Sequence, residues 1–276
     1  LHALLAGALE AAAPGAIRLG SPVSGAEADG TVLFADGSRA RHAAVVGADG
    51  VRSAVRAALF PGDAPLFTGQ VAWRGIVERA VLGPAHRDAL PGIHIGPGRL
   101  FLRYPVRAGQ LINYAAFVET EGWEEESWTI PSSPDELMDH FAGCDPLVEA
   151  VVRATPPGRL FKWALHAREP LATWIAGRVT LLGDAAHAML PFMGQGAATA
   201  IEDGMVLARC IAAFAPDEAL ARYEAARRER TAMVQLQSRL MGLQFQGRDP
   251  EALGRGPLRN EEALGLFDYD AVTAPL

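Results

Sequence analysis

The sequence has 276 residues, of which 50% are hydrophobic and 21% charged, and its formal net charge is −7. This length and composition predict a folded globular protein with a substantial core, not a disordered chain. The negative balance, without a basic block, argues against nucleic acid as a partner. No apolar run is long enough to span a membrane and no signal peptide is recognised, so we expect a cytoplasmic protein without a membrane partner.

The two cysteines, Cys144 and Cys210, stand alone in the sequence. Neither belongs to a CxxC pair or has a histidine at metal-ligand spacing, so no metal site is expected. Isolated cysteines usually behave as small hydrophobic residues, which agrees with a reducing compartment.

The first sixty residues predict a helix, a hairpin and one buried strand. Residues 1–9 read as a helix already under way, because no capping Ser, Thr, Asp or Asn precedes them. Asp36-Gly37 is a hairpin signal, and we predict a type I′ turn with positive φ at both residues. The other elements expected here are a strand at 17–19, hairpin strands at 31–35 and 38–42, a buried strand at 43–46 and a helix at 53–59.

A cluster of breakers at 61–65 marks the crossing into a second region that is mainly β. The acidic segment 119–126 reads as a solvated loop. The region's predicted strands cover 71–77, 100–106, 111–118 and 161–166, and its predicted helices cover 134–141 and 146–152.

The stretch at 177–211 organises the chain. Residues 179–182 read as a strand buried on both faces, and Asp184 follows Gly183 where such a strand meets a ligand crevice. Pro191 fixes a loop before Gly194-Gln195-Gly196 opens a helix. A carboxylate, close-approach glycines and a helix N-terminus together suit a flat ligand with hydroxyl groups and developing negative charge.

Two helices are expected to close the chain. The first runs to about Ile211. The second covers 216–246 with one break, and its basic residues read as a solvated face. The residues expected on the buried side of the first helix are Ala197, Ala200, Ile201, Val206, Leu207 and Ile211, and the basic residues of the second are Arg227, Arg228 and Arg230.

The run Gly183-Asp184-Ala185-Ala186-His187, followed by Pro191 and Gly194-Gln195-Gly196, resembles the second FAD-binding motif of the group A flavoprotein aromatic hydroxylases. Within that family it is similar to the salicylate hydroxylase and 3-hydroxybenzoate 6-hydroxylase branch. Residues 47–56 resemble the family's Asp-Gly motif, and the Tyr-Asp ending at 269–270 resembles the tail of this branch, with an expected packing role.

The resemblance implies roles for individual residues. Asp184, after Gly183, would hold the ribityl chain, and Pro191 would lie beside the isoalloxazine. Gly194, Gln195, Gly196 and Ala197 would direct amides at flavin N1 and O2, whereas Asp49 and Gly50 would lie at the pyrophosphate and ribose side, with Arg56 completing that motif. The residues expected at the substrate pocket are Trp73, His94, Arg103, which could meet a substrate carboxylate, Tyr104 and Pro191.

The resemblance also implies a fold and a reaction. The expected fold is α/β, α+β overall: a partial FAD-binding Rossmann-like domain (1–65, continued at 168–276 with C-terminal helices) and an antiparallel-sheet substrate domain (66–167). The expected function is a monooxygenase that uses FAD, NADH or NADPH, and O₂ to hydroxylate a small phenolic acid. His187 is expected to be structural, no catalytic base is assigned, and a homodimer is left open.

The family's Gly-x-Gly-x-x-Gly fingerprint does not occur in the sequence, because Gly96-Pro97-Gly98 has no third glycine at the required position. We therefore expect a truncated chain, which puts FAD binding by the chain alone in question. The alternative is a truncated, non-catalytic remnant that serves as a binding module or has no activity. Within enzymes, an epoxidase or a hydroxylase of a non-aromatic substrate also stays open.

Overall fold

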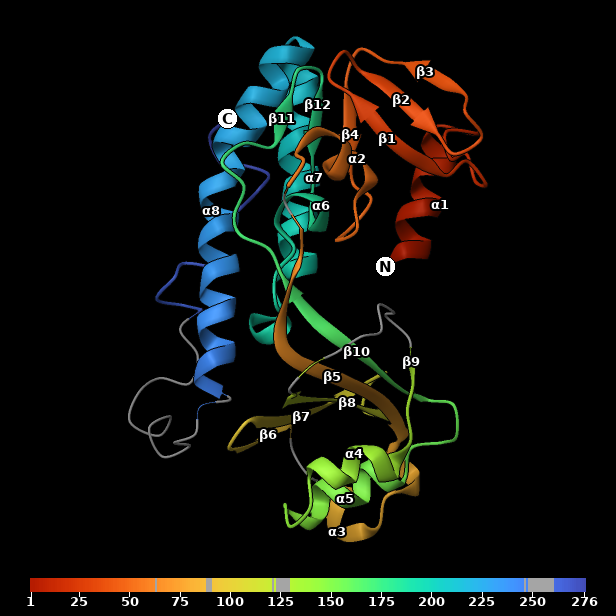
Figure 1. Ribbon diagram of the computed structural model, residues 1–276, viewed down its shortest axis with the longest axis vertical. Helices are drawn as coiled ribbons and strands as arrows, with labels where there is room; N and C mark the ends of the chain where they lie inside the picture. The colour runs from red at the N-terminus through yellow and green to blue at the C-terminus, as the bar shows by residue number, and fades with distance from the viewer. Residues whose placement is uncertain (63, 88–90, 121, 123–129, 246, 248–260) are drawn as a thin grey trace.

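The computed structural model describes residues 1–62, 64–87, 91–120, 122, 130–245, 247 and 261–276. Figure 1 shows a six-stranded sheet at one end of the molecule and smaller sheets packed with helices at the other end. The long helix α8 (Pro216–Phe245) runs beside both. The predicted mixture of a partial α/β unit, an antiparallel sheet and C-terminal helices is confirmed.

The N-terminal part contains one helix, a three-stranded antiparallel sheet and the first strand of a second sheet. Residues 17–19 form no strand, and the chain pairs further on, from Val23. The elements are α1 (His2–Ala12), β1 (Val23–Glu27), β2 (Thr31–Phe34), β3 (Arg39–Arg41), β4 (Val45–Gly47) and α2 (Ala54–Leu59).

The hairpin between β2 and β3 exists, but the predicted type I′ turn is wrong. Of the two turn residues Asp36 and Gly37, only Gly37 has a positive φ, of 86°. Its amide donates to the Phe34 carbonyl at 3.0 Å. The Ser38 amide donates to Asp36 Oδ1 at 2.8 Å. The loop is therefore one residue longer than a type I′ loop and closes with glycine at the left-handed position.

The middle of the chain forms the six-stranded sheet, in the order β6-β7-β8-β5-β10-β9, with antiparallel pairing throughout. Its strands are β5 (Leu66–Glu78), β6 (Gly92–Gly96), β7 (Arg99–Val106), β8 (Leu111–Glu119), β9 (Ile130–Pro131) and β10 (Leu160–Ala167). The helical elements of this part are η1 (Arg79–Val81), α3 (Pro84–Arg87), α4 (Pro134–His140) and α5 (Pro146–Arg153). The predicted acidic loop at 119–126 lies largely outside the described residues.

The two faces of this sheet belong to different cores because strand side chains alternate between faces. Trp73 and Phe101 belong to the core under α4 and α5, together with Leu137 and Val148 of those helices. The neighbouring residue of β5, Ala72, belongs to the other core, which includes residues of η2 and α8. One residue along β5 thus separates a structural face from a face that meets the C-terminal elements.

The C-terminal part returns to the second small sheet, in the order β11-β12-β4. Its strand β12 pairs in parallel with β4, so residues far apart in the sequence share one sheet edge. The elements are β11 (Ile175–Ala176), β12 (Val179–Leu181), α6 (Asp184–His187), η2 (Pro191–Met193), α7 (Gly196–Ala213) and α8. The division into 1–65, 66–167 and 168–276 stays a prediction.

Two expectations for the long helices are wrong. The helix α8 has no break over its 30 residues, because the sequence offers no glycine or proline between 217 and 241. On α7, Ile201 and Ile211 are each 53% exposed, although both were expected on its buried side. The buried side instead carries polar as well as apolar residues, namely Thr199, Asp203, Val206, Leu207 and Cys210.

The chain's end packs onto these helices, as predicted. Leu266 joins the core of the sheet face, while Ala271 and Leu276 pack against the core around α7. The Tyr269 ring lies under the guanidinium groups of Arg227 and Arg230, at 4.9 and 4.2 Å from the ring centroid. Among the helices of the described residues, none combines the length and apolar character that crossing a membrane requires.

The first prediction concerns Gly242 of α8, which leaves room for the Phe192 ring. A Cβ at Gly242 would lie 2.4 Å from Phe192 Cε2, and Phe117 backs that ring with centroids 5.0 Å apart. We expect Gly242→Ala to lower the free energy of unfolding by about 1–3 kcal/mol through overpacking, despite alanine's better helix propensity.

Gly204→Ala is the matched control, because Gly204 lies inside α7 and a Cβ there would meet nothing within 4 Å. It should raise stability by about 0.5–1 kcal/mol. Urea denaturation followed by circular dichroism measures both, and equal effects of the two substitutions would contradict the packing role of Gly242.

Candidate functional site

The end of β12 leads directly into the Gly-Asp motif. Gly183 has φ +61°, and Asp184 begins the short helix α6 with an exposed side chain. A Cβ added at Gly196, the first residue of α7, would lie 4.0 Å from Asp184 Oδ1. The carboxylate therefore lies in front of the N-terminus of α7.

The N-terminus of α7 carries no side-chain cap, since Gln195 makes no capping hydrogen bond. The preceding Gly194 adopts the left-handed conformation, with φ 67° and ψ 19°, and ends the turn that Pro191 begins. First-turn amides without a capping side chain, at the positive end of the helix dipole, can donate to a ligand. The loop and helix start thus present donors, and Asp184 presents an acceptor.

The Asp-Gly motif is built around the start of α2. Asp49 accepts from the Ser53 hydroxyl at 2.5 Å and from the Val55 amide at 3.1 Å. Ser53 in turn accepts from the Arg56 amide at 2.8 Å and caps the helix. The Asp49 carboxylate therefore fixes the turn that contains Gly50, and its proposed contact with a cofactor stays a prediction.

Arg56 joins this motif to the Gly-Asp motif. Its side chain is 1% exposed, and Nη1 donates to the carbonyls of Ala185 and Ala186 at 3.0 and 2.9 Å. Both acceptors belong to α6, immediately after Asp184. A buried guanidinium so placed holds two motifs together that lie far apart in the sequence.

A buried carboxylate, Asp203 of α7, supports the Gly-Asp motif from behind. Its Oδ2 accepts from the Gly183 amide at 3.1 Å and lies 2.5 Å from His187 Nε2. Its Oδ1 accepts from Arg227 Nε of α8 at 2.8 Å. Asp203 and Arg227 are both 0% exposed. One carboxylate therefore ties β12, α6, α7 and α8 together.

Burial by itself raises the pKa of Asp203 by disfavouring the charged form, but the hydrogen bonds and charges of His187 and Arg227 outweigh burial. The net result is a pKa below the ordinary value of 3.8. Asp203 is thus held as a carboxylate wherever the protein is folded at neutral pH.

His187 and Arg227 take structural places. His187 is 2% exposed, bonds Asp203, and lies with its ring centroid 5.4 Å from that of Trp174. Arg227 is not on a solvated face, because it is buried between Asp203 and Glu202. Arg230, 13% exposed at its side chain, also bonds Glu202, so of the three arginines only Arg228 is substantially exposed, at 40%.

A cavity of about 620 Å³ lies between the Pro191–Gly194 loop and the face of the large sheet that meets α8. The loop contributes Pro191, Phe192 and Gly194, and α8 contributes Phe245. The sheet side is formed mostly by apolar residues, with a few polar ones: Arg74, Pro91, Gly92, Ile93, Leu100, Leu102, Arg103, Tyr104, Asn113, Ala115, Phe117 and Trp163. Its described lining contains no Asp, Glu or His.

The predicted pocket residues fall into two groups. Tyr104 and Pro191 line the cavity. Trp73 does not, because its ring lies on the opposite face and its Nε1 donates to Ser132 at 3.0 Å. His94 does not line it either: Nδ1 lies 3.6 Å from Asp145 Oδ2, and the ring stands edge-on to Phe101.

Arg103 borders the cavity, but its guanidinium lies toward the opposite face. Its Nη2 would be 2.9 Å from a Cβ on Gly92, and its charge acts on His94. Burial lowers the pKa of His94, the Arg103 charge adds to that effect, and Asp145 opposes it. Trp73 and His94 thus belong to the structural face, and Arg103 turns its charge in that direction.

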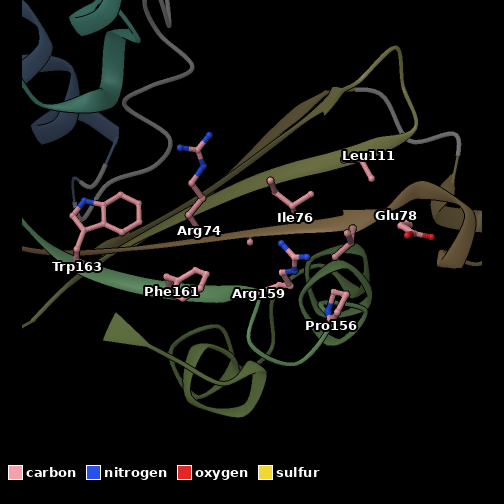
Figure 2. Close-up of a pocket in the computed structure, with 10 residues that line it drawn as sticks. Arg74, Ile76, Glu78, Leu111, Pro156, Arg159, Phe161 and Trp163 are labelled. Atoms are coloured by element: carbon pink, nitrogen blue, oxygen red, sulfur yellow. The ribbon is translucent and has the colours of Figure 1, made fainter. Parts of the chain in front are cut away.

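Sequence reasoning missed Arg74, Asn113 and Trp163, which do line the cavity. The available signal was alternation along β5: if Trp73 points into one core, Arg74 points to the other face. Arg74 and Trp163 also line an adjoining open groove of about 760 Å³, together with Ile76, Phe161 and Arg159 (Figure 2). The two hollows meet at Arg74 and Trp163.

Comparisons with known proteins match this geometry. A family model described as an FAD binding domain matches residues 25–238. The 3-amino-4-hydroxybenzoate 2-monooxygenase of Streptomyces platensis is 38% identical, over 86% of this chain and 60% of that protein. Salicylate hydroxylase of Pseudomonas putida is 34% identical, again over 86% of this chain and 60% of the relative. This chain therefore spans about 60% of the length of these relatives.

A solved structure of a salicylate hydroxylase substrate complex superposes with a TM-score of 0.81 at 33% identity. The match covers 98% of this chain and 73% of that one.

The described residues contain no group of three metal-ligating side chains.

The second prediction concerns Asp203. Asp203→Asn should lower the free energy of unfolding by about 2–4 kcal/mol near neutral pH, because it removes the buried carboxylate shared by His187 and Arg227 and leaves Arg227 with Glu202 as its remaining acidic partner. The folded-state pKa of Asp203 lies below the unfolded value, so its stabilisation is present above that value and is lost as pH falls through the folded pKa. The gap between wild type and variant should therefore shrink in acid.

Urea unfolding at about pH 7 and about pH 3 measures this gap. Asp217→Asn, at an exposed position in the first turn of α8, is the control and should stay within about 0.5 kcal/mol of wild type. A gap for Asp203→Asn that is constant with pH would contradict the proposed charge state.

Proposed function

Because the chain belongs to the FAD binding domain family, we propose that the protein is an FAD-dependent monooxygenase that hydroxylates a small aromatic acid with NADH or NADPH and O₂. The observation that carries the proposal is the arrangement of Asp184, Gly194 and the uncapped α7 terminus beside a mostly apolar cavity. The relatives named above are an aminohydroxybenzoate monooxygenase and a salicylate hydroxylase, which supports an aromatic acid as substrate.

The residues present fit the flavin end of FAD. Gly196 has no Cβ, and the nearest atoms to such a Cβ, Met189 Cγ and Asp184 Oδ1, lie 3.8 and 4.0 Å away, so a flat ring system could approach the helix start. The amides of Gly194, Gln195, Gly196 and Ala197 would face the ring's polar edge, and Asp184 would accept hydrogen bonds from the ribityl hydroxyls. Gly183, Pro191, Asp49 and Gly50 are assigned to the same cofactor as part of this proposal.

Bound FAD, once reduced by the nicotinamide, would supply the activation of O₂ and the transfer of one oxygen atom to the substrate ring. This chain's residues position the ring and exclude water. Leu100, Leu102 and Phe117 form an apolar wall facing Phe192 of the loop, which orients an aromatic ring and keeps water from the reacting atoms. No catalytic base is assigned, since the described lining holds no carboxylate or imidazole.

The remaining assignments belong to the same proposal. We infer a cytoplasmic location from the two cysteines without disulfides, and small-molecule partners rather than nucleic acid from the net charge of −7. A homodimer is left open. The proposed division is a substrate unit at 66–167, inserted between two parts of the FAD-binding unit.

The competing proposal is a truncated, non-catalytic remnant of such an enzyme that serves as a binding module or has no activity. Retention of the Asp184, Pro191 and Gly194 geometry supports the enzyme instead, because a binding module without flavin would not need an uncapped helix start beside a glycine in the left-handed conformation.

The third prediction tests flavin binding. The purified chain titrated with FAD should show the structured visible spectrum of a bound flavin, and Asp184→Ala should weaken binding about tenfold, the loss expected for charge-assisted hydrogen bonds. Asp217→Ala, which removes an exposed carboxylate from another helix start, should bind like wild type.

Oxidation of NADH that depends on a salicylate-like acid, with detection of the hydroxylated product, then tests the reaction. A folded chain that retains no flavin would overturn the prediction that this chain alone binds FAD.

A further inference from the structure

We propose that Arg74 and Asn113 form the binding site for the substrate's carboxylate, at the junction of the two hollows on the large sheet. This inference rests on the proposed function for the ligand's identity, but its evidence is the geometry of these two side chains. It replaces Arg103, whose guanidinium lies toward the opposite face.

The pair is joined by one hydrogen bond. Arg74 of β5 donates from Nε to Oδ1 of Asn113, on the neighbouring strand β8, at 3.0 Å. Because the guanidinium can only donate, this bond fixes which end of the Asn113 amide is oxygen. The two protons of Nδ2 therefore point away from Arg74.

Those protons have no acceptor among the described residues. Asn113 is 2% exposed, and its Nδ2 is buried without a hydrogen-bond partner. A buried donor left unpaired costs about 1–3 kcal/mol, so its retention calls for a ligand acceptor. Asn113 lines the 620 Å³ cavity, and this cavity is where such an acceptor can reach it.

Arg74 adds a positive charge to the same place. In the described part of the chain, the structure gives its side chain one hydrogen bond, from Nε to Asn113, and no ion pair. The described lining of the cavity contains no carboxylate that could neutralise it. In the adjoining groove Glu78 is the sole described acidic residue, and it forms no ion pair with Arg74.

The site consequently offers donors and positive charge in otherwise mostly apolar surroundings that include Leu102, Phe117 and Trp163. A carboxylate satisfies both donors at once and gains from the low dielectric, whereas a neutral amide or an amine leaves donors unmet or adds repulsion. With the carboxylate held at Arg74 and Asn113, the aromatic ring would extend into the cavity that faces Pro191 and Gly194. The chemical class selected is therefore an aromatic carboxylate.

The experiment compares salicylate with its neutral analogue salicylamide by isothermal titration calorimetry, with FAD present. Wild type should bind salicylate at least about tenfold more tightly, the factor expected for a charge-assisted hydrogen bond. Asn113→Asp, which turns the buried donor into an acceptor and adds repulsion, should abolish this preference. Asn113→Leu and Arg74→Gln should each reduce it about tenfold while leaving salicylamide binding within about twofold.

Arg159→Gln is the matched control, because Arg159 is an exposed arginine that lines only the adjoining groove. It removes the same charge and should leave the preference within about twofold of wild type. Thermal unfolding of each variant checks folding, and the paired aspartate and leucine substitutions keep the test valid if one of them fails to fold.

A preference for salicylate that survives in Asn113→Asp and Arg74→Gln would overturn the inference, and so would equal binding of acid and amide by wild type. Either result leaves the flavin titration untouched, so failure of the carboxylate site is distinguishable from failure of the proposed monooxygenase. Loss of preference in Arg159→Gln to the same degree would also overturn it, by showing a general charge effect.

Discussion

The structure depends on one buried carboxylate. Asp203 accepts from Gly183 of the Gly-Asp motif and from Arg227 of α8, and it pairs with His187. A charge taken out of water is tolerated only where partners surround it, so these contacts specify one arrangement of α7 against α8. Arg227 extends the set to Glu202, which also binds Arg230, and both arginines lie over the Tyr269 ring.

The same carboxylate explains how a glycine-rich stretch can hold a defined conformation. The functional stretch contains Gly183, Gly194 and Gly196, and glycine alone gives a loop too much freedom to hold a ligand's position. The Asp203 bond to the Gly183 amide fixes one end, and Arg56 fixes the α6 carbonyls from the other side. The buried side chains of Asp203 and Arg56 thus supply the rigidity that the glycines of this stretch lack.

The sequence could predict the motifs but not the buried side chains that hold them in place. Asp184, Pro191 and Gly194 are close in the chain and their spacing is informative, whereas Asp203 reads as an ordinary helical carboxylate until the fold brings His187 and Arg227 to it. The arginines at 227–230 show the limit of sequence-based prediction. Their pattern fits a solvent-exposed helix face, and only the packing of α7 against α8 buries Arg227. On the sheet the difficulty is of another kind, because a shift of one residue along a strand changes its face: Trp73 lies in the core under α4 and α5, whereas its neighbour Arg74 lines the cavity.

Three consecutive residues of β5 show why that choice matters. Trp73 bonds Ser132 and fixes the sheet to the α4 side, and Arg74 turns to the cavity and bonds Asn113. Gly75 leaves space for the Tyr114 ring, whose hydroxyl hydrogen-bonds the Thr155 hydroxyl at 2.7 Å. Burial raises the pKa of Tyr114 to about 12, so this hydroxyl keeps its proton near neutral pH. Because Tyr114 directly follows Asn113 and points to the opposite face, its anchorage to Thr155 limits how far β8 can move. The buried amide of Asn113 is therefore held in place by the structural face, and recognition on one side of the sheet depends on packing on the other.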